Sequence, residues 1–402
     1  MFRDARARWA AISLLVGQAV SASYFYSPSS LYLYMANDLG QNVSGLGDLS
    51  TAFVLGIGGF QIPGGILAEK IGPRKTIIYG TFIAAVSTLL TGFPNQIALL
   101  SLLRFLTGVG MAFIFAPCIT LVTRFFHKEH MGIGVGLVGG AFDLGGVAVI
   151  PGWAELGKIE GWRVSFVIAG VLGLLALVAI IFLVPKDEVR PDFKFRMEGL
   201  KKVLLNKWFL AFGIAALSAQ VGWNTIGQFM VFYLQDDFSL APATAGLAGS
   251  IFLSCALLSS PLAGRIYSRG GRPMVMLVGG GLLSAAGLAT AALASPYAPW
   301  VSTAVVGLAD GFGFTTAYIL AREVNGPDPE YETLAVSWVN GITLFGSFWT
   351  PILFSFSALG FGYHVAWLVS GLASLPLLVP VVALRLRSTI PIARREARSE
   401  NT

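Results

Sequence analysis

Three ionisable side chains lie deep inside long apolar stretches of this chain: Arg104, Asp143 and Asp310. In the centre of a lipid bilayer, a charged group costs about 3 kcal/mol or more unless it is paired or wetted. Such residues therefore mark candidate sites of chemistry. A guanidinium there could anchor an anion, and a carboxylate could take up and release a proton.

Two of the three also have a structural explanation. Arg104 and Asp143 could form an ion pair, and Arg104 could instead bond to the backbone of the first apolar stretch. Asp310 has no obvious basic partner in the sequence, which leaves protonation, cation binding and exposure to a wet cavity as the alternatives for it. We take Arg104 as a substrate-binding candidate and Asp143 and Asp310 as proton-coupling candidates.

The composition indicates which elements must position these groups. The 402 residues are 55% hydrophobic and 12% charged, with a mean hydropathy of +0.73, whereas a soluble domain has about 25% charged residues. The bilayer is therefore the expected solvent, and a spanning helix needs about 20 apolar residues. We predict an all-α membrane protein with twelve spans, at 9–34, 48–69, 74–94, 96–122, 131–154, 162–184, 207–235, 241–266, 273–294, 298–322, 331–357 and 362–385.

Positive charges set the expected orientation. With the N-terminus inside, 24 of the 27 Lys and Arg residues fall in inner segments, as the positive-inside rule requires of a protein with both termini in the cytoplasm. The net charge of +6 thus reflects membrane sidedness, and we expect no nucleic-acid partner. The longest polar interruption predicts an N-terminal half at 1–185, a cytoplasmic linker at 186–206 and a C-terminal half at 207–402.

An internal repeat links the two halves. The segment Gly65–Lys75 (GILAEKIGPRK) returns as Pro261–Pro273 (PLAGRIYSRGGRP), with equivalent glycines 199 positions apart. Pro151 and Pro351 are likewise 200 positions apart. The repeat predicts two pseudo-symmetric six-helix bundles around a central pathway.

Catalytic and metal-binding patterns are weak. Cys118 and Cys255 both lie in apolar stretches and have no metal-ligand spacing. His127 and His130 flank Glu129, a pattern that we interpret as a solvated loop. We therefore predict no cofactor, no metal and no enzymatic activity.

The glycine-rich loop resembles a signature of the major facilitator superfamily, G-x-L-A-D-R-x-G-R-R/K, in the Gly65–Lys75 segment. Arg104–Gly108 is similar to that family's R-x-x-x-G pattern in the fourth span. The second loop copy is weaker, because Ser268 stands where an acid is common. The resemblance implies a secondary transporter with alternating access and a binding site near the bilayer midplane.

This sequence departs from the motifs of two branches of the family. The drug-antiporter branch has G-P-x-x-G-G in span 5, and this chain lacks the Gly-Pro pair there. The nitrate branch has arginines in spans 2 and 8, and neither span has a mid-membrane arginine here. Both departures disfavour those branches.

The resemblance also implies which residues line the pathway and which gate it. A polar stripe in span 7 supports this assignment, because amides turned towards lipid would be costly. The expected substrate-binding residues besides Arg104 are Gln18, Tyr24, Trp223, Asn224, Gln228, Tyr318, Trp338 and Asn340. The expected gating residues are Gly65, Glu69, Lys70, Gly72, Arg74, Lys75, Arg124 and Arg269, with topology control by positive charge as the alternative. We interpret Tyr32, Tyr34 and Trp162 as interfacial anchors.

These features predict proton-coupled symport of a small organic anion, such as a monocarboxylate, across the cell membrane by a monomer. A drug/proton antiporter is the alternative within transport, and a transporter-like membrane sensor is the alternative from another class. The expected partners are the substrate, protons and the lipid bilayer.

Overall fold

The computed structural model describes residues 2–127, 131–186, 201, 204–324 and 329–387, and these residues are helical almost throughout. We call the helices up to residue 183 the N-half and those from residue 207 the C-half. The N-half contains α1 (Ala5–Leu39), α2 (Val43–Gly59), α3 (Gln61–Ile71), α4 (Pro73–Thr91), α5 (Ile97–Ala112), α6 (Phe115–Arg124), α7 (Met131–Ile159) and α8 (Trp162–Leu183). The C-half contains α10 (Lys207–Asp236), α11 (Pro242–Ser268), α12 (Pro273–Ala291), α13 (Ala298–Val324), α14 (Pro329–Gly346), α15 (Trp349–Phe361), α16 (Tyr363–Ser374), the 3₁₀ helix η2 (Leu375–Leu378) and α17 (Val379–Arg387).

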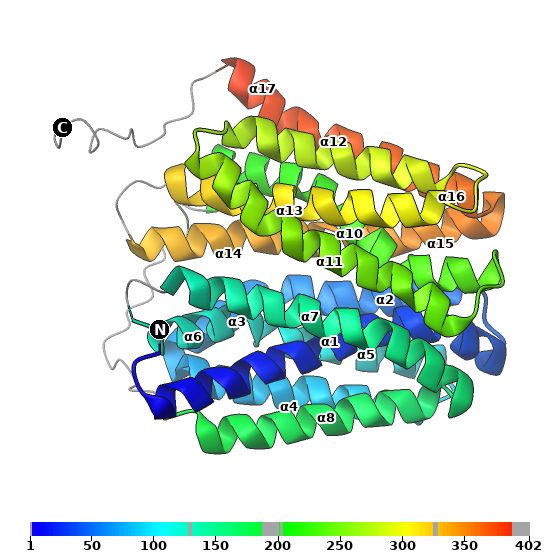
Figure 1. The fold of residues 1–402 in the computed structure, drawn as a ribbon, viewed down its shortest axis with the longest axis horizontal. Coiled ribbons are helices and arrows are strands. Elements are labelled where there is room, and N and C mark those ends of the chain that lie inside the picture. The colour runs from blue at the N-terminus through cyan, green and yellow to red at the C-terminus, as the bar shows by residue number, and fades with distance from the viewer. Residues whose placement is uncertain (1, 128–130, 187–200, 202–203, 325–328, 388–402) are drawn as a thin grey trace.

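The helices run side by side, with the N-half and the C-half occupying separate parts of the molecule (Figure 1). Within the described residues, ten helical segments are long and apolar enough to cross a membrane. The other two predicted spans correspond to α1 and α4. These helices are less apolar, because α1 carries many serines and tyrosines and α4 begins with Arg74 and Lys75.

Three predicted spans are each divided into two α-helices before a proline, and a fourth, 362–385, passes through the 3₁₀ helix η2 between α16 and α17. Phe60 separates α2 from α3 before Pro63, and Phe113 begins the break between α5 and α6 before Pro117. The third break separates α14 from α15 before Pro351. A proline removes the hydrogen bond to the carbonyl four residues earlier and crowds that carbonyl. Proline therefore explains all three breaks.

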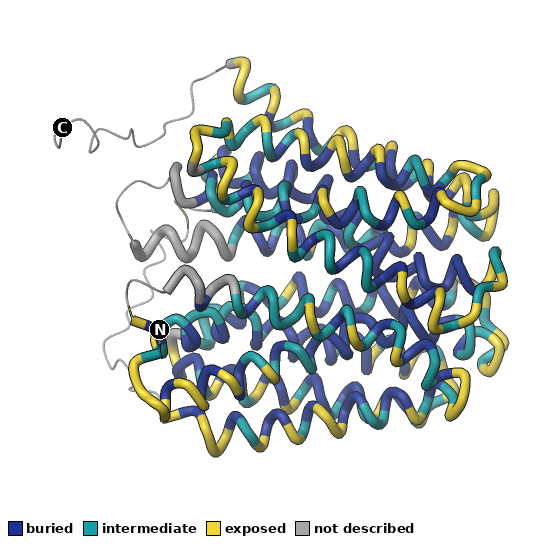
Figure 2. The backbone as a smooth tube through the Cα atoms, in the orientation of Figure 1, coloured by how far each residue is buried: buried dark blue, intermediate teal, exposed yellow. Residues whose placement is uncertain are grey.

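The most buried helix is α10, which lies in the interior of the assembly. Nearly every residue from Trp208 to Gln235 is buried, whereas α8 has many exposed apolar side chains. Figure 2 shows this contrast, with exposed residues along the outer ribbons and buried residues where the halves meet. A helix that is covered all round suits a site shared by both halves.

Glycines bring α2 and α5 into backbone contact. A Cβ atom on Gly108 would collide with the Phe53 carbonyl, and one on Gly56 would collide with the Phe105 carbonyl. This close approach lays the Arg104 guanidinium over the Phe53 ring, 4.3 Å from its centroid. The R-x-x-x-G spacing thus positions the buried charge.

Glycine and proline also meet across the boundary between the halves. A Cβ atom on Gly246 of α11 would lie 2.5 Å from Cα of Pro151 on α7. In the same way, Gly47 of α2 lies against Ser355 and the Pro351 carbonyl of α15. Gly47 and Gly246 are 199 positions apart, as the loop glycines are. The sequence repeat therefore corresponds to equivalent contacts in space.

Candidate functional site

Arg104 is almost completely buried, and it bonds to the backbone of α1. Its Nη1 donates to the Tyr24 carbonyl at 2.7 Å. That carbonyl lacks its usual helical partner, because the residue four positions later is Pro28, which has no N–H. Although a proline inside a helix can break it, α1 continues through Pro28. Arg104 supplies the missing hydrogen bond from another helix.

The other donors of Arg104 are unused. Nε and Nη2 are buried and have no hydrogen-bond partner among the described residues. The ion pair with Asp143 is not formed: the salt bridges found in the described chain are Lys158–Glu155 and Arg163–Asp38. Of the two structural alternatives for Arg104, the backbone bond is therefore confirmed. Two donors of a buried cation remain for a ligand.

A hydrogen-bonded cluster joins the halves beside Arg104. The Gln228 Oε1 atom of α10 accepts from Ser50 Oγ at 3.1 Å and from the Tyr32 hydroxyl at 3.4 Å. The Tyr32 and Ser50 oxygens also contact each other, so the two hydroxyl protons are shared among these three contacts. Tyr32 also interacts electrostatically with Arg104. Our interpretation of Tyr32 as an interfacial anchor is wrong, because its side chain is fully buried.

Aromatic rings fill the space between this cluster and the predicted acids. The Phe53 ring contacts Phe25 with centroids 5.1 Å apart, and Phe25 contacts Trp223 with centroids 4.6 Å apart. Trp223 of the C-half also lies 6.1 Å from the Tyr26 ring and 6.4 Å from the Phe252 ring. The rings form a continuous apolar wall that crosses the boundary.

The two predicted acids come from opposite halves and face a common region. Asp143 of α7 and Asp310 of α13 are close enough to interact electrostatically with each other, and both interact with the buried Tyr26 phenol. Asp310 also interacts with Tyr318, whose hydroxyl donates to Asn340 Oδ1 at 2.9 Å. Tyr26 lies two residues, or about 3 Å of helix, after Tyr24, whose carbonyl accepts from Arg104. The acids and Arg104 therefore both interact with the same part of α1.

Four predicted binding residues lie elsewhere in the helix packing. The Tyr24 ring lies against Gly173 of α8 and Ala85 of α4, inside the N-half. Asn224 donates to Ser347 Oγ at 2.7 Å, within the C-half. Gln18 is buried and its Oε1 atom has no described partner, and the half-buried Trp338 packs against the cluster that contains Trp208 and Phe212. None of these contacts joins the Arg104 region to the acids.

The predicted gating loop is partly defined. Gly72 has a φ of 93°, which favours glycine, and it forms the turn between α3 and α4. Gly65 lies inside α3, and a Cβ atom there would meet nothing within 4 Å, so neither a turn nor close packing requires a glycine at this position. Arg74 donates to the carbonyls of Val184 and Ile181 at 2.8 and 2.7 Å, and so caps the end of α8.

The remaining gating candidates are less informative. Lys70, Lys75, Arg124 and Arg269 are exposed, and the Glu69 side chain lies outside the described residues. The acid of the predicted charge network is thus undescribed, and the network stays a prediction.

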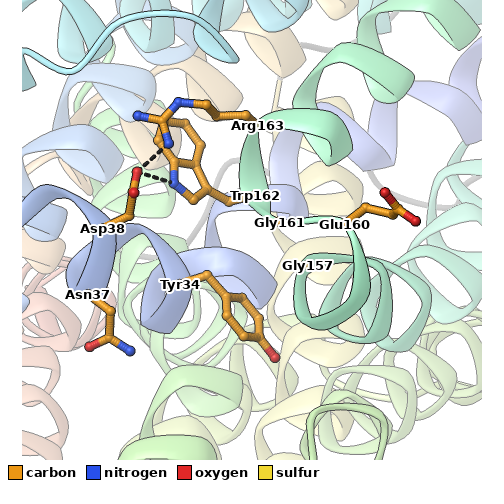
Figure 3. A pocket seen from close by; sticks show the side chains of 8 residues that line it. All are labelled: Tyr34, Asn37, Asp38, Gly157, Glu160, Gly161, Trp162 and Arg163. Carbon is orange, nitrogen blue, oxygen red and sulfur yellow. Dashed lines mark hydrogen bonds and ion pairs between the residues drawn. The ribbon is translucent and has the colours of Figure 1, made fainter.

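A separate pocket of about 460 Å³ lies where α1 meets α7 and α8 (Figure 3). Asp38 accepts hydrogen bonds from Arg163 Nη1 and, at 3.1 Å, from Trp162 Nε1. These two bonds, the Arg163 bond foremost, hold the pKa of Asp38 below its usual range. Arg163 also donates to Asn95. Because these side chains hydrogen-bond to one another, we interpret them as a polar contact that holds α1 to α8, and we call this contact the outer brace.

Sequence analysis missed Ser50, Phe53 and Phe25. Serine and phenylalanine are ordinary in a spanning helix, and nothing in their spacing distinguishes them. Ser50 and Phe53 lie one turn apart on the same face of α2, and Gln228 and Arg104 contact that face. Only these tertiary contacts identify Ser50 and Phe53 as site residues.

The fold and site define the class: a helical membrane transport protein with buried polar groups between two sets of spanning helices. The sequence matches the model of the Major Facilitator Superfamily over residues 14–232 and 212–401. The chain therefore belongs to the Major Facilitator Superfamily.

Similar proteins agree with this assignment. The solved structure of the nucleoside transporter NupG superposes with a TM-score of 0.76 at 15% identity, covering 94% of this chain and 99% of NupG, which shows the fold. A probable sulfoacetate transporter of Cupriavidus necator is 32% identical over 168 residues, which are 41% of this chain and 38% of that protein. A probable nitrate transporter of Staphylococcus haemolyticus is 25% identical over 262 residues, or 62% of this chain and 64% of that protein. These matches span less than two thirds of either relative.

Proposed function

We propose that this protein moves a small organic anion across the cell membrane by alternating access, together with protons. The observation that carries the proposal is the Arg104 guanidinium, which is buried while two of its nitrogens lack partners. An uncompensated buried charge is costly, and an anion bound to Nε and Nη2 would offset that cost. Sulfoacetate and nitrate, for which the two relatives are named, are both anions.

The proton step is assigned to Asp143 and Asp310. The two carboxyls come from opposite halves and are close enough to interact electrostatically, and two negative charges repel each other. Approach of the halves is therefore favoured when a proton neutralises one acid. Protonation in one state and release in the other would couple the proton to the rocking of the halves.

The alternating states require two bundles that move as units. The N-half and C-half are proposed to be pseudo-symmetric six-helix bundles, supported by the equivalent Gly47–Pro351 and Gly246–Pro151 contacts. Positive-inside charge supports cytoplasmic termini for a monomer. The loop from Gly65 to Lys75 is proposed to secure the inner side, with Arg74 holding α4 to α8.

Transport assays with purified protein in proteoliposomes test this function. Labelled acetate, lactate, sulfoacetate and nitrate are offered with and without an imposed pH gradient. Gradient-driven uptake that Arg104→Gln abolishes, while Arg163→Gln at the outer brace leaves it intact, supports the proposal.

Two other results would replace it. Gradient-driven export of lipophilic cations without anion uptake would establish the drug/proton antiporter. Anion binding without transport of any solute would establish the sensor.

A further inference from the structure

Gln228 offers a second set of unused donors opposite Arg104. Its Oε1 atom is occupied by the hydroxyls of Ser50 and Tyr32, which leaves the amide nitrogen Nε2. That nitrogen is buried and has no hydrogen-bond partner among the described residues. A buried donor without a partner is unfavourable, so Gln228 can donate to an acceptor that the protein does not provide.

Gln228 and Arg104 meet the same face of α2. Ser50 bonds to Gln228, and the Arg104 guanidinium lies over the Phe53 ring. Ser50 and Phe53 are three residues apart, so their Cβ atoms lie about 5–6 Å from each other on one helix face. Tyr32 bonds to Gln228 and interacts electrostatically with Arg104. The unused donors of a C-half amide and an N-half guanidinium therefore have Tyr32 and one face of α2 as common neighbours.

The number and arrangement of these donors select the ligand. Arg104 Nε and Nη2 form one edge of a planar fork, which matches two oxygens of an anion. A carboxylate has only those two oxygens, whereas a sulfonate has a third oxygen directed away from the fork. Because Arg104 is the cation of this site, a singly charged head group is neutralised and a dianion is not.

We infer that Gln228 Nε2 binds the third oxygen of a sulfonate held by Arg104, which makes Gln228 the residue that distinguishes sulfonates from carboxylates. This inference rests on the proposed anion transport and specifies its substrate. The hydroxyls of Ser50 and Tyr32 are positioning groups, because they occupy Oε1 and so turn Nε2 towards the ligand.

Binding of matched ligand pairs to the purified full chain tests the inference. Ethanesulfonate and propionate share a two-carbon chain, and dissociation constants come from the ligand-dependent shift of thermal unfolding. One hydrogen bond is worth about 1 kcal/mol, so we expect ethanesulfonate to bind about fivefold to tenfold tighter than propionate.

Variants assign the preference to one atom. Gln228→Met keeps the size of the side chain and removes the donor, so the ratio of the two constants should fall to about one while propionate binding changes less than about twofold. Gln235→Met is the matched control, because Gln235 is a buried glutamine on the same helix, and it should keep the ratio. Ser50→Ala with Tyr32→Phe retains the Nε2 donor but frees the amide, and should lower the ratio partly.

The outcomes separate the two proposals. Equal binding of both anions by the unaltered protein, or an unchanged ratio in Gln228→Met, would overturn the role of Gln228 and leave anion transport standing. Loss of the ratio in Gln235→Met as well would also overturn it, because the effect would then not belong to Nε2. Failure of every anion to bind would remove both proposals.

Discussion

Replacing Arg104 by methionine, with and without Pro28, tests whether this arginine repairs the backbone of α1. Pro28 leaves the Tyr24 carbonyl without a helical donor, and Arg104 Nη1 donates to it at 2.7 Å. In Pro28→Ala the new backbone N–H can bond to that carbonyl, which makes the arginine bond redundant. The two substitutions should therefore be coupled.

The size of the coupling follows from this bond. A hydrogen bond from a charged donor contributes about 1.5–3 kcal/mol. Removing the guanidinium also removes its desolvation cost, so the effect of Arg104→Met alone has no simple sign. The double-mutant cycle cancels that shared term and isolates the interaction. We expect Arg104→Met to lower the free energy of unfolding by about 2 kcal/mol more when residue 28 is proline than when it is alanine.

Denaturant titration in mixed micelles gives the four free energies of unfolding, and anion binding provides an independent readout. Pro28→Ala should keep anion binding, because Nε and Nη2 are unchanged, whereas Arg104→Met should lose binding in both backgrounds. A coupling energy within about 0.5 kcal/mol of zero would refute the proposed backbone repair. Recovery of anion binding in the double variant would refute the assignment of Arg104 as the anchor.

Three further predictions follow from the described contacts. Asp143→Asn and Asp310→Asn should each abolish accumulation driven by a pH gradient, at least about tenfold, while exchange of labelled for unlabelled anion persists; unchanged gradient-driven uptake would remove that acid from coupling. Gly108→Ala should destabilise the protein by about 1–3 kcal/mol, because its methyl group meets the Phe53 carbonyl; Gly139→Ala, which meets nothing within 4 Å, is the control, and equal unfolding midpoints would contradict the packing argument. Hydrogen bonds from Arg163 and Trp162 lower the pKa of Asp38 in the folded protein. The stabilisation that they provide is therefore present above the unfolded pKa and is lost as the pH falls through the folded pKa. The free energy of unfolding should change less between pH 6 and pH 3 in Asp38→Asn than in the unaltered protein, and an identical change would exclude a stabilising role of these bonds.

The sequence predicted the spans, the repeat and the three ionisable side chains within the spans, because each follows from local composition or from self-similarity. It left the partner of Arg104 open between Asp143 and the backbone. The deciding feature, Pro28 four residues after Tyr24, is local, but the helix that supplies the missing donor is known only from packing. Ser50 and Phe53 were missed for the same reason. Neighbouring helices give these two ordinary residues their roles.

The contacts between the halves explain how modest binding energies could drive the cycle. Gly246 approaches backbone atoms of Pro151, and Gly47 approaches the Pro351 carbonyl, so glycines let the halves come close together there. Pro151 also frees the Val147 carbonyl, which accepts a hydrogen bond from Ser250 of the other half at 2.7 Å. Each such bond contributes about 0.5–1.5 kcal/mol, and so does each bond to Gln228. A ligand that bridges Arg104 and Gln228 adds an interaction of comparable size across the same boundary, and a difference of this size between two states is sufficient to shift their populations.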